Sequence, residues 1–84
     1  MLPLFTELVP SGPTLAQRPK TILTYIDTFT AGHGFPPTVR EIRDGLGLSS
    51  TSVVKYHLDA LETDGWITRQ SRASRGIRIL RLPA

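Results

Sequence analysis

The chain has 84 residues and a mass of 9.3 kDa, with 39% hydrophobic and 20% charged residues, which fits one small soluble domain and excludes a multidomain enzyme. It contains no cysteine, which excludes disulfides, thiolate metal sites and cysteine nucleophiles. The net charge of +3 is unevenly spread, since residues 1–65 have a balance of −2 whereas residues 66–84 have +5, with five arginines and no acid.

The first 17 residues contain three prolines and no sustained periodicity, so we expect a flexible or extended arm over residues 1–17 and one domain over residues 18–84. The arm has no basic residue ahead of its apolar stretch, unlike a signal peptide. No run approaches the roughly 18 apolar residues that a bilayer span requires. We therefore expect a cytoplasmic protein.

The first helix is expected to begin near Pro19, because a proline is tolerated in a first helical turn. Gly32-His33-Gly34 is expected to end it. Its apolar residues recur at helical spacing, at Ile22, Leu23, Ile26 and Phe29.

A short second helix is expected after Pro36-Pro37, which favours an extended step. Thr38 and Glu41 have the spacing of a capping box, in which each side chain binds the backbone N–H of the other. Gly47 suits a left-handed C-terminal cap. The buried face is expected to contain Ile42 and Leu46.

The turn over residues 48–51 leads directly into a third helix. Val54, Leu58 and Leu61 form its apolar stripe, at spacings of four and three residues. The opposite side and its flanks are expected to hold Ser52, Val53, Lys55, Tyr56, Asp59 and Thr63.

Two strands are expected after Asp64-Gly65, over residues 66–70 and 77–82, joined by a loop over residues 71–76. The faces of the second strand are ambiguous, because Ile77 and Ile79 have the opposite parity to Leu80 and Leu82, and either a bulge or burial on both sides would explain this. Three helices with a tight turn between the last two, followed by a basic hairpin, predict a winged helix-turn-helix, an α+β fold that is mainly α.

Four motifs resemble the DNA-binding domain of the LexA family of bacterial SOS repressors. They are the segment from Phe35 to Ile42, the Leu-Gly-Leu-Ser-Ser of residues 46–50, the His-Leu-Asp-Ala-Leu of residues 57–61 and the Ala-Ser-Arg-Gly-Ile-Arg of residues 73–78. The likeness extends from about Leu15 to Leu80 without an evident gap.

In that family the third helix reads base edges in the major groove and the wing contacts DNA near the minor groove. The resemblance therefore implies base-reading roles for Ser50, Ser52, Val53, Lys55 and Tyr56. It implies backbone or wing contacts for Arg18, Ser74 and Arg75, to which the basic hairpin and a helix N-terminus add Arg72 and Thr38.

The family's second domain, which dimerises and cleaves its own linker at an Ala-Gly bond, has no counterpart in these residues. The Ala31-Gly32 pair lies at the end of the first predicted helix, and the two lysines, Lys20 and Lys55, lie in helices. We therefore expect neither self-cleavage nor that dimer surface.

Several residues also have simpler interpretations than DNA contact. Lys55 could pair with Asp59 one turn on, and Tyr56 could pack on the wing. Trp66 is expected to anchor the hairpin rather than stack on a base. The two histidines, His33 and His57, are expected to be packing or turn residues, without a metal. The five arginines could form only a solvated face, at Arg69, Arg72, Arg75, Arg78 and Arg81.

We predict a transcription regulator of bacterial or phage origin that binds double-stranded DNA, with no enzymatic activity and no cofactor. A LexA-like repressor of the SOS response would act by covering its operator, and useful specificity would need a homodimer on an inverted repeat. Two alternatives remain: a protein-interaction module that uses the basic hairpin, and the DNA-binding half of a longer LexA-type repressor. The Met1 start and the proline-rich arm favour an independent small protein over that half.

Overall fold

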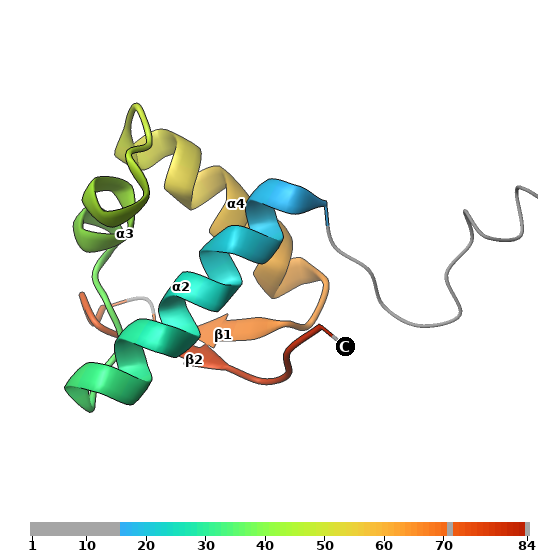
Figure 1. The fold of residues 1–84 in the computed structure, drawn as a ribbon. Coiled ribbons are helices and arrows are strands. Elements are labelled where there is room, and N and C mark those ends of the chain that lie inside the picture. Colours follow the sequence, from blue (N-terminus) through green and yellow to red (C-terminus); the bar gives the residue numbers. More distant parts are fainter. Residues whose placement is uncertain (1–15, 71, 84) are drawn as a thin grey trace, which may run out of the picture.

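The computed structural model describes residues 16–70 and 72–83 (Figure 1). Three helices are followed by a two-stranded antiparallel sheet, which confirms the predicted winged helix-turn-helix. Residues 1–15 of the predicted arm lie outside the described residues, and the first helix already includes Gln17. The elements are α2 (Gln17–His33), α3 (Val39–Leu46), α4 (Thr51–Thr63), β1 (Ile67–Arg69) and β2 (Ile77–Ile79).

The helix ends follow from local sequence. Gly34 caps α2 with φ of 84° and Gly47 caps α3 with φ of 67°, both in the left-handed region that glycine enters without steric cost. The predicted capping box at the start of α3 is complete. The Glu41 N–H donates to the Thr38 hydroxyl at 3.1 Å, and the Thr38 N–H donates to the Glu41 carboxylate at 2.9 Å.

One hydrophobic core lies where the three helices meet the sheet, with α2 crossing α4 and the strands beneath both in the view of Figure 1. Burying a large apolar side chain in such a core contributes about 1.5–3 kcal/mol. The core residues are at most 8% exposed: Ile22, Leu23, Ile26, Ile42, Val54, Leu58, Leu61, Trp66, Ile67 and Ile77.

Two predicted core residues lie at its edge. Leu46 is half-buried and packs against the core from α3. Phe29 is half-buried and stacks on His33, with ring centroids 3.8 Å apart, and on the edge of Phe35 at 6.1 Å. The end of α2 therefore carries an aromatic cluster beside the core.

The strands are shorter than predicted, with three residues each, and pair in the register Ile67 with Ile79 and Arg69 with Ile77. The apolar residues that alternate out of step in the predicted second strand do not all belong to it, because β2 ends at Ile79. Leu80 and Leu82 follow it and are 56% and 48% exposed. The proposed bulge or two-sided burial was therefore wrong.

Candidate nucleic-acid interface

The face of α4 that points away from the core is polar and exposed. Tyr56 is 70% exposed, and Ser52 and Lys55 are also exposed. Within the described part of the chain, none of these three side chains makes a hydrogen bond or an ion pair. The first turns of α4 therefore offer a hydroxyl, an ammonium and a phenol to a partner.

Two further predicted base-reading residues have partial structural roles. Ser50 caps α4, because its hydroxyl oxygen accepts the N–H of Val53 at 3.4 Å. This leaves the hydroxyl hydrogen of Ser50 available as a donor. Val53 is half-buried, on the flank of the exposed face.

The alternative in which Lys55 pairs with Asp59 is not what the structure shows. Asp59 binds the guanidinium of Arg69, which also donates to Glu62 at 2.9 Å. The ring of Tyr56 lies edge-to-face with the ring of its neighbour His57, with centroids 5.1 Å apart.

Several arginines of the C-terminal segment already bind other groups of the same chain. Arg69 is committed to acids of α4, and Arg75 to Glu41 in α3. Arg81 lies 4.5 Å from the ring centroid of Trp66 and donates to the carbonyl of Asp64 at 3.0 Å. Of the five arginines, only Arg72 and Arg78 make no ion pair or hydrogen bond with another described residue.

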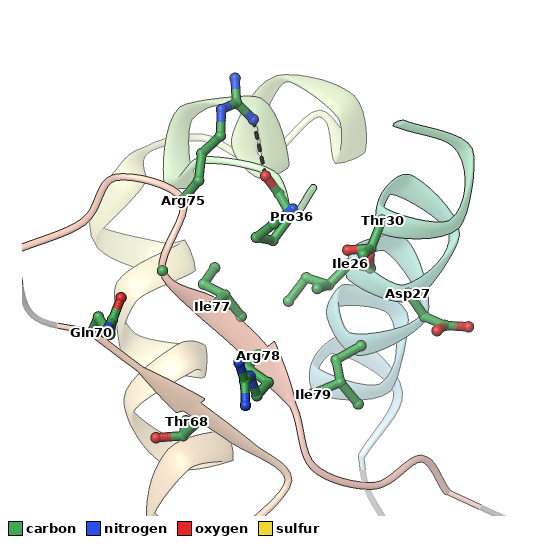
Figure 2. A pocket seen from close by; sticks show the side chains of 11 residues that line it. Ile26, Asp27, Thr30, Pro36, Thr68, Gln70, Arg75, Ile77, Arg78 and Ile79 are labelled. Carbon is green, nitrogen blue, oxygen red and sulfur yellow. Dashed lines mark hydrogen bonds between the residues drawn. The ribbon is translucent and has the colours of Figure 1, made fainter. Parts of the chain in front are cut away.

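Arg75 lies in the wing loop between β1 and β2, and its guanidinium reaches the segment between α2 and α3 (Figure 2). It donates to the carbonyl of Pro36 at 2.9 Å and to both carboxylate oxygens of Glu41, at 2.7 and 2.9 Å. Its charge also lies 4.6 Å from the ring centroid of Phe35. The hydrogen bonds from Arg75 to Glu41, together with the one from the N–H of Thr38, lower the pKa of Glu41 to about 2.

The other predicted backbone contacts lie on three separate elements. Arg18 is exposed in the first turn of α2. Thr38 is half-buried, and its hydroxyl is used by the capping box. Arg72 and Ser74 are exposed in the wing loop with Arg75.

The two histidines lie in different surroundings. His57 is half-buried, and its pKa is lowered by burial and by the positive charge of Arg18. His33 is exposed and places Nδ1 3.0 Å from the carbonyl of Phe29. Within residues 16–70 and 72–83, no cluster of three potential ligands is present, and no helix is long and apolar enough to cross a membrane.

A groove of about 650 Å³ separates the second half of α2 from β2 (Figure 2). Its ionisable lining residues are Asp27, Arg75 and Arg78.

The sequence prediction missed the contact between Arg75 and Glu41, because the two residues are 34 positions apart. It also missed the contact between Tyr25 and Gly45, where the tyrosine ring covers the helix backbone. A glycine inside a short helix is the one local signal for such a close approach.

The family model for the LexA DNA binding domain matches residues 13–76. The LexA repressor of Roseiflexus sp. (strain RS-1) is 55% identical over 69 residues, covering 82% of this chain and 32% of that protein. The LexA repressor of Geotalea uraniireducens (strain Rf4) is 48% identical over 63 residues, covering 75% of this chain and 31% of that protein. The chain thus spans about a third of the length of these relatives.

Proposed function

Because the chain belongs to the LexA DNA-binding domain family, we propose that it is a sequence-specific, double-stranded-DNA-binding transcription regulator. It would be a LexA-like repressor of the SOS response that covers its operator. The observation that carries this proposal is the exposed face of α4, on which Ser52, Lys55 and Tyr56 have no polar partner within the described residues. A solvent-facing row of unused donors on the second helix of a helix-turn-helix suits the major groove.

Each residue of that face has a chemical counterpart on a base edge. The Lys55 ammonium can donate to O6 or N7 of guanine, and the Tyr56 ring and Val53 methyls can contact a thymine methyl. The hydroxyls of Ser50 and Ser52 can donate to base or phosphate oxygens. This set would read four or five base pairs.

Contacts to phosphates would fix the orientation of the domain on the duplex. We assign them to residues outside α4, on α2, at the start of α3 and in the wing loop. Phosphate contacts carry affinity and register but little sequence information. The assigned residues are Arg18, Thr38, Arg72, Ser74 and Arg75.

One such module should bind weakly, so we propose that two copies bind an inverted repeat. Because the chain spans about a third of its relatives, a second candidate is that it represents the DNA-binding part of a longer LexA-type repressor. Both candidates place the protein in a bacterial cytoplasm and make the same contacts to DNA.

The alternative of a protein-interaction module is less well supported. It requires the hairpin arginines as a free basic surface, yet Arg69 and Arg81 bind other groups of the same chain. The exposed face of α4 would have no role in it.

The test is selection from a randomised duplex pool, followed by fluorescence anisotropy of the selected site and of a scrambled duplex at several salt concentrations. We expect an inverted repeat that binds at least about 10³-fold more tightly than the scrambled duplex. If no sequence is enriched and both duplexes give one weak, steeply salt-dependent curve, the proposal is wrong and only a polyanion surface remains.

A further inference from the structure

Arg75 holds the wing loop to the rest of the fold, close to the start of β2. Among the described residues of the loop, the Ala73 N–H donates to the Gln70 carbonyl and the Gly76 N–H donates to the Ala73 carbonyl, each at 3.2 Å. The Gln70 N–H donates to the Gly76 carbonyl at 3.1 Å. Because these bonds tie Gln70, Ala73 and Gly76 together, fixing the Arg75 side chain restrains the described residues of the loop.

The partner of Arg75 is itself held in place. The carboxylate of Glu41 accepts the N–H of Thr38, and the Glu41 N–H donates back to the Thr38 hydroxyl. An exposed ion pair normally contributes little, because two long side chains must be ordered to form it. Here the carboxylate is already ordered by the capping box. The two hydrogen bonds from Arg75 also fix the orientation of the guanidinium relative to the carboxylate.

We propose that Glu41 is a positioning residue for DNA binding, and that with Arg75 it forms a latch that holds the wing loop against the start of α3. The inference rests on the proposed function, because the loop matters for binding only if the wing meets DNA. Glu41 would act without touching the DNA itself.

The latch leaves part of Arg75 available. Nη1 uses both of its hydrogens, on Pro36 and Glu41, and Nη2 uses one, on Glu41. The Nε hydrogen and the other Nη2 hydrogen meet no acceptor among the described residues. These two donors form a second parallel fork that suits a phosphate. One guanidinium can therefore bind Glu41 and DNA together.

The direction in which neutralising Glu41 changes the affinity for DNA distinguishes this latch from simple competition between Glu41 and DNA for Arg75. If Glu41 merely withdrew Arg75 from DNA, its neutralisation would strengthen binding to a polyanion. If Glu41 positions the wing, the same change weakens binding. Glu41→Gln is the suitable variant, because glutamine also serves in a capping box and keeps the size of the side chain.

The matched control is Asp44→Asn, which removes the same charge from the same helix. Asp44 binds its neighbour Arg43 at 2.8 Å and makes no hydrogen bond or ion pair with a described residue of the wing. Two readouts are needed: the Kd for the selected duplex, and amide hydrogen exchange of Gln70 and Gly76 in the free protein. Arg75→Lys tests the other partner in the latch, because lysine keeps the positive charge but cannot donate two parallel hydrogen bonds.

We expect Glu41→Gln to bind about three- to tenfold more weakly than Asp44→Asn, because an unlatched wing occupies its binding position for only a fraction of the time. Both loop amides should exchange faster in Glu41→Gln and in Arg75→Lys. Adding Glu41→Gln to Arg75→Lys should weaken binding no further, since the latch is already broken.

Glu41→Gln binding as tightly as Asp44→Asn, or more tightly, would overturn the latch, and so would additive losses in the double variant. If the unmodified protein prefers no DNA sequence, the proposed function fails, and hydrogen exchange alone decides the inference. Unchanged exchange of both loop amides in Glu41→Gln and Arg75→Lys would then overturn it.

Discussion

The ring of Tyr25 in α2 lies directly over the backbone of Gly45 in α3, so closely that a Cβ at position 45 would overlap the ring. The Tyr25 hydroxyl donates to the carbonyl of Glu41 at 3.3 Å. The absence of a side chain at Gly45 is therefore what lets these two helices approach. The contact explains why a residue that weakens helices occupies the interior of such a short one.

Gly45→Ala should destabilise the domain. Alanine in place of a helical glycine normally stabilises by about 0.5–1 kcal/mol, but overpacking costs about 1–3 kcal/mol. We expect a net loss in the free energy of unfolding, measured by urea denaturation. Gly32→Ala is the matched control, because nothing lies within 4 Å of its added Cβ, and it should stabilise. A gain from Gly45→Ala equal to that of Gly32→Ala would show that Tyr25 moves away at no cost.

Lys55→Ala should weaken binding to the selected duplex by about 1–3 kcal/mol and relax the preference at one base pair. Lys55 is exposed on α4 and has no acidic partner in the described part of the chain. Lys20→Ala removes the other lysine, which is exposed on α2, and should change affinity little. Repeating the selection with both variants gives the measurement. Equal effects of the two would mean that Lys55 contributes only charge.

The carboxyl of Glu41 should titrate at about pH 2, far below its ordinary value, because the pKa of Glu41 is lowered by hydrogen bonds from Arg75 and Thr38. Since the folded pKa lies below the ordinary value of 4.5, the associated stabilisation is complete above that pH and is lost as the pH falls toward 2. The measurement is the side-chain ¹³C shift followed by NMR. In Arg75→Gln the midpoint should rise, though not fully, because Thr38 still donates. If the midpoint stays near pH 2 in this variant, the helix cap alone lowers the pKa of Glu41.

His57 reports on the charge of Arg18. The pKa of His57 is lowered by burial and by that charge, so a phosphate that pairs with Arg18 should raise the pKa of His57 when DNA binds. An NMR pH titration with and without the selected duplex measures this. In Arg18→Gln the pKa of His57 should be higher in the free protein and rise less with DNA. If the pKa of His57 in the unmodified protein does not rise when DNA binds, Arg18 does not contact a phosphate.

The same shift has a consequence for stability in the free protein. The folded pKa of His57 lies below its ordinary value of 6.5, so the unfolded chain binds the proton more readily. The contribution of His57 to stability is therefore complete above that pH and declines as the pH falls below it.

What could be predicted from the sequence was local. The capping box of Thr38 and Glu41 and the stripe of Val54, Leu58 and Leu61 involve residues within one or two helical turns, and both are present. The extent of β2 could not be predicted, because Leu80 and Leu82 have the composition of a strand but are not covered by the rest of the fold.

The candidate site also has a part that the sequence predicted and a part that it did not. The exposure of Ser52, Lys55 and Tyr56 followed from helical periodicity. The commitment of Arg75 to Glu41 did not, since it depends on how the wing folds back over α3. Charge counted along the sequence therefore overestimated the free positive charge of the wing.

The contacts of Arg81 with Trp66 and Asp64 hold the chain's last described residues beside the junction of α4 and β1, at the opposite end of the sheet from the wing loop (Figure 1). A fluorescent protein or an affinity tag fused to this end of the chain would thus emerge away from the first turns of α4 and from Arg75. This end therefore suits the immobilisation of the domain on a sensor surface, because the groups proposed to meet DNA would remain open to solution.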